Sequence, residues 1–188
     1  MRKLASFLMV SLDGYFEGEQ PWEIDWHAVD DEFNEFAIQQ LDASDRLIFG
    51  RATYLGMAQY WPTEEAVRTD PDVAHRMNSM PKIVVSRTLE EAEVDWSNTR
   101  VLRDAKELAR LKNGSGKDML VLGSSVLTTS LMEDGLLDEL RIIVNPVLLG
   151  AGHSLSSSAG RRIQLKLLST REFRNGNMLL TYAPAKAS

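Results

Sequence analysis

The chain of 188 residues contains no cysteine. Disulfide bonds, thiolate metal ligands and a cysteine nucleophile are therefore excluded, and a cytoplasmic location is favoured. The two common glycine-rich signatures of nucleotide-binding proteins are also missing, because neither GxGxxG nor GxxxxGK[ST] occurs. A standard Rossmann site and a P-loop are thus not indicated.

Positive charge is scarce. The chain has 21 Lys and Arg against 27 Asp and Glu, which gives a net charge of −6. An acidic protein repels the phosphates of nucleic acids and anionic lipids, so we expect neither as a partner. No hydrophobic run approaches the roughly 18 residues of a membrane-spanning helix. Arg2-Lys3 before the apolar run Leu4–Val10 resembles the start of a signal peptide, but the run is short and no small-residue cleavage site follows.

The length and composition favour one globular domain. Hydrophobic residues make up 44% and charged residues 26%, which are ordinary values for a packed protein. A chain of this length fits one domain of typical size. We therefore predict a single domain over residues 1–184 and a frayed tail over residues 185–188.

Short apolar runs without polar alternation predict strands that are buried on both faces. They are Leu4–Val10, Arg46–Phe49, Lys82–Ser86, Met119–Leu122 and Leu140–Leu149, the last with a break or an edge position at Pro146. Helical spacing of apolar residues predicts helices over Asp30–Leu41 and Ser125–Glu133.

Near the carboxyl end, Asn175-Gly176 between two strand-like runs predicts an antiparallel hairpin with a type I′ turn. Together the elements predict an α/β fold whose sheet is mostly parallel and ends in an antiparallel hairpin.

Three predicted strands end in residues suited to binding anions. They read LIFGRAT (residues 47–53), VVSRT (84–88) and VLGSSVL (121–127). Glycine allows close approach of the backbone, arginine offers a guanidinium fork, and a helix that begins with small residues presents free N–H groups to phosphate. Each motif alone also fits an ordinary turn glycine, a surface arginine or a helix-capping serine. Ligands in open α/β sheets bind at the carboxyl ends of strands, so we expect these three ends to meet at one site.

The ordered series of motifs resembles the dihydrofolate reductase superfamily. The pieces are SLDGYF, LIFGRATY, PKIVVSRTL, DMLVLGSSVLTTSLMEDGLLDELRIIVNPVLLGAG and REFRNGNMLLTY. The resemblance is closer to the branch that contains the reductase domain of the bifunctional riboflavin-biosynthesis deaminase–reductase and its stand-alone bacterial relatives. It implies a three-layer αβα fold with a mixed eight-stranded sheet, NADPH as hydride donor, a small-molecule substrate and a homodimer.

The resemblance also implies the residues that bind the cofactor. Gly50, Arg51 and Thr53 match the first residues of the family that contact phosphate. Ser86 and Arg87 match the strand end that contacts the 2′-phosphate of the adenosine ribose. The pyrophosphate turn matches Gly123, Ser124, Ser125, Val126 and Leu127. Because the turn keeps a single glycine, Ser124 and Ser125 must either tolerate the same backbone geometry or bind phosphate through their hydroxyls. The nicotinamide is expected near Val10, Ser11 and Gly123.

On the substrate side, residues Ser11–Trp26 match the family's mobile loop over the nicotinamide, with Pro21-Trp22 inside it. Trp22 and Trp61 are expected to border the pocket. Folate reductases have one buried carboxylate on the following helix. An alignment without a gap places Asn34 at this position, and an alignment with a longer loop after Leu41 places Glu32 there. Glu32 or Asp31, or a water that they hold, is the expected proton donor, with a pKa raised by burial at Glu32.

Other interpretations remain open or carry little weight. Asp25, His27, Asp30 and Asp31 could be imagined as metal ligands, but acidic residues at a helix start also complement its dipole, and no metal is expected. The predicted activity is reduction of a small heterocycle, imine or carbonyl, such as a 5-amino-6-(5-phosphoribosylamino)uracil-type or pterin-type compound. A non-catalytic NADP(H)-binding sensor and a dimeric scaffold are the alternatives.

Overall fold

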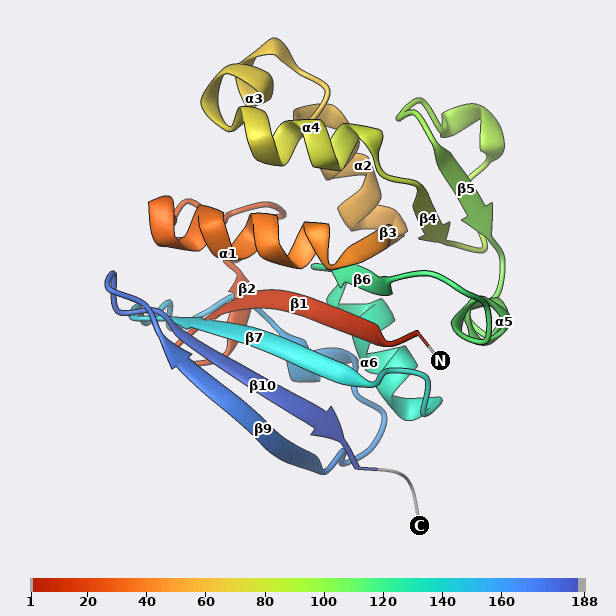
Figure 1. Ribbon diagram of the computed structural model, residues 1–188. Coiled ribbons are helices and arrows are strands. Elements are labelled where there is room, and N and C mark those ends of the chain that lie inside the picture. Colours follow the sequence, from red (N-terminus) through yellow and green to blue (C-terminus); the bar gives the residue numbers. More distant parts are fainter. Residues whose placement is uncertain (1, 186–188) are drawn as a thin grey trace.

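An eight-stranded sheet forms the centre of the protein in a computed structural model that describes residues 2–185. The strand order is β5-β4-β3-β6-β1-β7-β10-β9 (Figure 1). All pairs from β5 to β7 are parallel, and β10 is antiparallel to both of its neighbours. The strands of this sheet are β1 (Leu4–Ser11), β3 (Ser44–Gly50), β4 (Lys82–Val85), β5 (Thr99–Leu102), β6 (Asp118–Leu122), β7 (Glu139–Asn145), β9 (Leu165–Glu172) and β10 (Met178–Pro184).

Helices cover both faces of the sheet. Figure 1 shows α1 to α4 on one face and α5 and α6 on the other, which makes three layers. The helices are α1 (Asp31–Asp42), α2 (Arg51–Tyr60), α3 (Glu64–Thr69), α4 (Pro71–Ser79), α5 (Glu107–Lys112) and α6 (Ser125–Glu133), with short 3₁₀ turns at Glu91–Glu93 and Leu155–Ser158. No helix within residues 2–185 is long and apolar enough to cross a membrane.

The central strand β1 divides the core in two. Phe7 and Met9 face the cluster under α1, α2 and α4, whereas Leu4 and Leu8 face the cluster under α5 and α6. Successive side chains of a strand point to opposite faces, so a continuous apolar run fills both layers. Ser6 adds a buried hydrogen bond of 2.6 Å to Thr128 of α6. This bond fixes the helix whose first residues form one wall of the site.

The predicted fold is confirmed, with two differences in detail. Each predicted strand overlaps an observed one, and β7 ends at Asn145, one residue before Pro146. The predicted hairpin forms, but the prediction of a type I′ turn is wrong. Phe173 pairs with Asn177 across a three-residue loop, and only Gly176 has a positive φ. Such a loop is a turn followed by a left-handed glycine, a geometry that Asn-Gly sequences also satisfy.

A second, two-stranded ribbon has no counterpart in the predicted elements. β2 (Tyr15–Glu17) pairs antiparallel with β8 (His153–Ser154). Each strand is too short to give a periodic pattern, and 136 positions separate Glu17 from its partner His153. The ribbon brings the loop after β1 beside the segment that follows β7.

The predicted tail lies mostly outside the described residues. Of residues 185–188, the structure describes Ala185 alone. Its backbone N–H donates to the carbonyl of Gln164 at 2.8 Å, so this residue is tied to the segment before β9 rather than frayed.

Candidate active site

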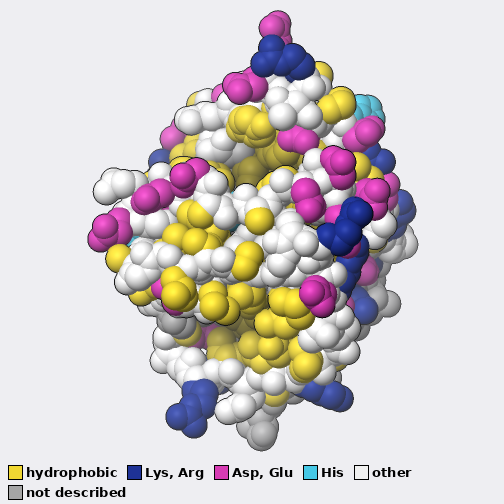
Figure 2. All heavy atoms as spheres, turned by 90° about the vertical axis from the view of Figure 1, so that its left-hand side faces the viewer, with side chains coloured by type: hydrophobic (Ala, Val, Ile, Leu, Met, Phe, Trp, Pro, Cys, Tyr) yellow, Lys and Arg dark blue, Asp and Glu magenta, His cyan; other side chains and the backbone are white. Residues whose placement is uncertain are grey.

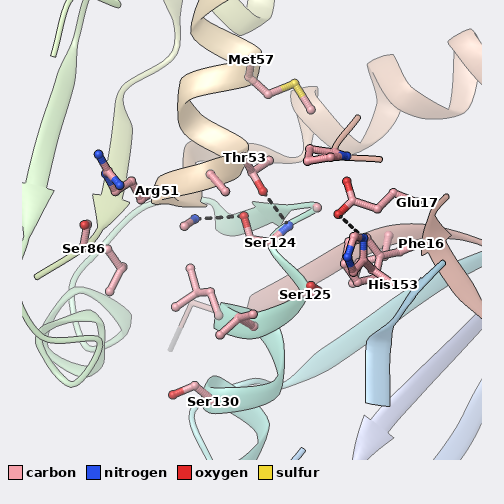
Figure 3. A pocket seen from close by; sticks show the side chains of 18 of the residues that line it. Phe16, Glu17, Arg51, Thr53, Met57, Ser86, Ser124, Ser125, Ser130 and His153 are labelled. Atoms are coloured by element: carbon pink, nitrogen blue, oxygen red, sulfur yellow. Dashed lines mark hydrogen bonds and ion pairs between the residues drawn. The ribbon is translucent and has the colours of Figure 1, made fainter. Parts of the chain in front are cut away.

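A cavity of about 840 Å³ opens at the carboxyl ends of β3, β4 and β6. The three predicted strand ends meet there, as expected from the parallel order β4-β3-β6. Figure 3 shows Arg51 and Ser86 on one side of the cavity, Phe16, Glu17 and His153 on the opposite side, and Ser124 between them. The lining includes Gly50, Arg51, Thr53, Ser86, Arg87, Gly123, Ser124, Ser125, Val126 and Leu127.

The turn between β6 and α6 has two consecutive residues in the left-handed region. Gly123 has φ +55°, and Ser124 has φ +57° and ψ +55°. A Cβ on Gly123 would lie 3.1 Å from Cγ2 of Thr53, a tight contact that adds to the strain of a positive φ. Ser124 therefore adopts a backbone geometry that favours glycine, at a cost of about 1–2 kcal/mol.

Hydrogen bonds from Ser124 compensate for this strain and join two strand ends. Its Oγ accepts from the N–H of Gly50 at 2.9 Å and donates to the carbonyl of Leu122 at 3.0 Å. Its own N–H donates to Oγ1 of Thr53 at 3.1 Å. The N–H of Gly50 thus already has a hydrogen-bond partner in the protein, and Ser124 links the end of β3 to the end of β6 (Figure 3).

Three arginines give the cavity its positive charge. The guanidinium of Arg87 is exposed, and within residues 2–185 it makes no hydrogen bond or ion pair. Nη2 of Arg51 is 3.6 Å from Oε1 of Glu93. The guanidinium of Arg103 donates to the carbonyls of Ser86 and Leu89. Arg87 is therefore the cation that is available to a ligand without breaking a contact.

Ser86 supplies a hydroxyl beside Arg87. Its Oγ accepts from the backbone N–H groups of Thr88 at 3.2 Å and Leu89 at 3.0 Å, which leaves the hydroxyl proton for a ligand acceptor. A hydroxyl and a guanidinium at one strand end are suited to a phosphate.

Some predicted contacts lie outside this cavity. Val10 is buried in β1, and its carbonyl accepts from Nδ2 of Asn145 at 3.2 Å, so the lining takes Leu8 and Met9 from this strand instead. Trp22 lines the cavity as predicted. Asn34 donates to Asp70, and the indole N–H of Trp61 donates to the sulfur of Met57, so both side chains have other partners.

The predicted raised pKa of Glu32 is wrong. Its carboxylate accepts from the backbone N–H of Arg174 at 3.0 Å and from the guanidinium of Arg171 at 3.0 Å, and these bonds lower its pKa. Glu32 faces the β9–β10 hairpin and is not among the residues that line the cavity. Asp31 is exposed at the start of α1 and is likewise outside the lining. Neither carboxylate is placed to deliver a proton into the cavity.

Instead, an ion pair from the small ribbon lies in the wall. Nδ1 of His153 is 3.1 Å from Oε1 of Glu17, and the imidazole stacks on Phe16 with 6.3 Å between ring centroids. The second oxygen of Glu17 accepts from the N–H of Trp22 at 3.0 Å, which attaches the loop to the ribbon. No sequence pattern marks His153 as a site residue, because only the β2–β8 pairing brings it to Glu17.

His27 is a second residue that was not predicted to line the site. The loop at Ala28 is clamped by three asparagine side chains: Asn145 accepts from its N–H, and Asn175 and Asn177 donate to its carbonyl. Burial lowers the pKa of His27 to about 4. Its Nε2 is buried without a hydrogen-bond partner within residues 2–185. The described residues contain no cluster of three or more His, Asp or Glu that could hold a metal.

The geometry defines a class of protein. A left-handed glycine turn at a helix N-terminus, beside a hydroxyl and an unpaired guanidinium, fits the phosphates of a dinucleotide, and the fold around it is dihydrofolate reductase-like. The sequence profile described as "RibD C-terminal domain" matches residues 2–179, so the chain belongs to that family.

The chain is also similar to individual proteins. It is 33% identical over 185 residues to the uncharacterized protein YyaP of Bacillus subtilis (strain 168), covering 96% of this chain and 94% of that protein. Among solved structures, it matches a diaminohydroxyphosphoribosylaminopyrimidine deaminase/5-amino-6-(5-phosphoribosylamino)uracil reductase from Thermotoga maritima with a TM-score of 0.67 and 15% identity, over 98% of this chain and 57% of that one. It matches dihydrofolate reductase from Enterococcus faecalis, complexed with NADP(H), with a TM-score of 0.63 and 16% identity, over 97% and 96% of the two chains.

His27 should make stability depend on pH. The unfolded chain takes up a proton below pH 6.5, whereas folded His27 does so only near pH 4. The free energy of unfolding should therefore fall as pH decreases from 6.5 towards 4, by at most about 3 kcal/mol from this group. Urea titrations of wild type and His27→Phe across this range measure the difference, with His75→Phe at an exposed site as control. Equal pH slopes in all three proteins would contradict it.

Proposed function

We propose that the protein is an NADPH-dependent reductase of a small heterocyclic, imine- or carbonyl-bearing compound. The observation that carries the proposal is one continuous cavity, in which an end suited to phosphates faces an apolar end that contains Glu17 and His153. The likeness to dihydrofolate reductase and to the Thermotoga maritima reductase supports the reaction class. An aminopyrimidine and a pterin are the candidate substrate types.

The protein's part in this reaction is binding and orientation. NADPH would supply the hydride. The guanidinium of Arg87 and the hydroxyl of Ser86 would hold the 2′-phosphate, and the N-terminus of α6 with Gly123 would hold the pyrophosphate. The bonds of Ser124 to Gly50 and Thr53 hold the pyrophosphate turn against the end of β3 and the start of α2.

We further propose that His153 delivers the proton that balances hydride transfer. In its protonated form, His153 would donate Nδ1–H to Glu17, which holds the ring orientation, and would pass the proton on Nε2 to the substrate; the neutral imidazole that remains keeps its Nδ1–H bond to Glu17. The proton is then replaced from solvent, because half of the His153 side chain is exposed. This replaces the expectation of a carboxylate on α1.

Cofactor preference tests the phosphate site. A charged hydrogen bond from Arg87 to the 2′-phosphate contributes about 1.5–3 kcal/mol. NADPH should therefore bind roughly ten- to a hundredfold more tightly than NADH, and Arg87→Ala should abolish the preference. Calorimetry with both dinucleotides measures it, with Arg100→Ala, an exposed arginine outside the cavity, as control. Equal affinities in wild type would refute this phosphate site.

Binding of NADPH without its oxidation in the presence of any pyrimidine, pterin or imine would favour a sensor over an enzyme.

Turnover tests the proton donor. His153→Phe keeps an aromatic ring beside Phe16 but removes the titrating nitrogen, so kcat should fall by about 10²–10⁴ while NADPH affinity stays unchanged. The kcat–pH profile of this variant should also lack the limb that the imidazole contributes to the wild-type profile. Glu32→Gln is the informative comparison, because a carboxylate donor on α1 would make that variant inactive and leave His153→Phe active.

The homodimer that the resemblance implies remains a proposal, and β9 is the surface that we assign to it. This strand is at the edge of the sheet, and Leu165, Leu167 and Leu168 are 39%, 50% and 50% exposed. An apolar edge strand with unpaired backbone groups invites pairing with a second copy. Light scattering should give a mass of two chains of 21.1 kDa, and Leu167→Glu with Leu168→Glu should give one chain. Val67→Glu on α3 is the control, and a monomeric wild type would exclude the dimer.

A further inference from the structure

The positive charges of the cavity all lie at one of its ends. Arg51 follows β3, Arg87 follows β4 and Arg103 follows β5. These three strands are neighbours at one edge of the sheet, in the order β5-β4-β3. All three arginines are thus on the side where the dinucleotide phosphates would bind.

The opposite end of the cavity, here named the substrate end, has a different character. Its lining comes from the loop after β1, the β2–β8 ribbon and α2: Phe16, Glu17, Pro21, Trp22, Ile24, His27, Met57 and His153. None of these described residues is a lysine or an arginine. Glu17 is the carboxylate of this end, and its Oε1 lies 3.1 Å from Nδ1 of His153.

The arginines of the neighbouring hairpin are not among the residues that line the cavity. Asn175 and Asn177 of the hairpin contact Ala28, next to His27, but Arg171 and Arg174 are both paired with Glu32. Figure 2, which views the left-hand side of Figure 1, shows apolar side chains across the middle of this face, acidic side chains on both sides, and Lys and Arg side chains at the top, on the right and at the bottom.

The polar groups of the substrate end are suited to a neutral ligand. His27 is uncharged at neutral pH, because burial lowers its pKa to about 4. Its Nε2 is buried without a hydrogen-bond partner within residues 2–185. Trp22, Phe16 and Met57 add flat or adaptable apolar surface, which packs well on a planar ring.

A phosphate at this end would be unfavourable. It would lose water beside the carboxylate of Glu17, the imidazole of His153 is already bonded to that carboxylate, and no lysine or arginine of the described lining lies at this end. We propose that the substrate is an uncharged, unphosphorylated planar heterocycle with a reducible C=N or C=O bond, an inference that rests on the proposed reductase function. The Thermotoga maritima protein is named as a reductase of a phosphoribosyl compound, so the two proteins would differ in substrate.

Two matched pairs of probes test the inference by binding alone. They are 5-amino-6-(ribosylamino)uracil with its 5′-phosphate, and 6-hydroxymethyl-7,8-dihydropterin with its phosphate ester. Calorimetry on the full chain, with and without NADPH, measures each affinity. At least one uncharged probe should bind, and its phosphate should bind about tenfold more weakly or worse. Tighter or equal binding of the phosphate, or binding of neither uncharged probe, would overturn the inference.

Charge variants at the substrate end test whether Glu17 causes the preference for uncharged probes. Glu17→Gln removes the negative charge with little change of shape, so the ratio of the two affinities should shrink several-fold. Glu19→Gln, an exposed carboxylate outside the cavity, is the matched control and should leave the ratio unchanged. An unchanged ratio in Glu17→Gln would overturn the electrostatic basis of the inference. NADPH binding is measured separately, so a protein that prefers uncharged probes but binds no NADPH would refute the reductase function alone.

Discussion

The contact between Ser124 and the end of β3 is the constraint on which the site depends. Ser124 holds a left-handed conformation, and its Oγ and N–H bond to Gly50 and Thr53. β3 and β6 are adjacent and parallel, so their ends already lie close, and these bonds fix the distance between them. The first turns of α2 and α6 are thereby held as two walls of one cavity. The strain at Ser124 persists because the surrounding bonds determine its geometry.

A second clamp holds the loop that closes the other end. Asn145, at the end of β7, and Asn175 and Asn177, in the β9–β10 hairpin, all bind the backbone of Ala28. Asn145 and Asn177 are fully buried, so these bonds form away from competing water. They position His27 against the cavity and anchor the start of α1. The antiparallel addition to the sheet therefore contributes to the site although it lines none of it.

The charges of the cavity follow from these two clamps. The parallel strands place arginines where they end, and the clamped loop with the β2–β8 ribbon supplies apolar rings and a carboxylate–imidazole pair. One half thus suits anionic phosphates and the other half suits a flat ligand of little charge. A hydride transfer needs both halves side by side, with the reacting atoms where they meet.

The amino-acid sequence by itself determined the layers and the meeting of three strand ends at one site. Continuous apolar runs specify strands buried on both faces, and strand ends in a parallel sheet meet at one edge, so local patterns were sufficient for Gly50, Ser86 and Gly123. Only the tertiary structure decided the substrate end. Glu17 and His153 meet through a ribbon too short to have a periodic pattern, and Glu32, on a predicted helix, is turned to Arg171 and Arg174 by the packing of the hairpin. Such pairings are set by long-range contacts, which leave no signal at either position in the chain.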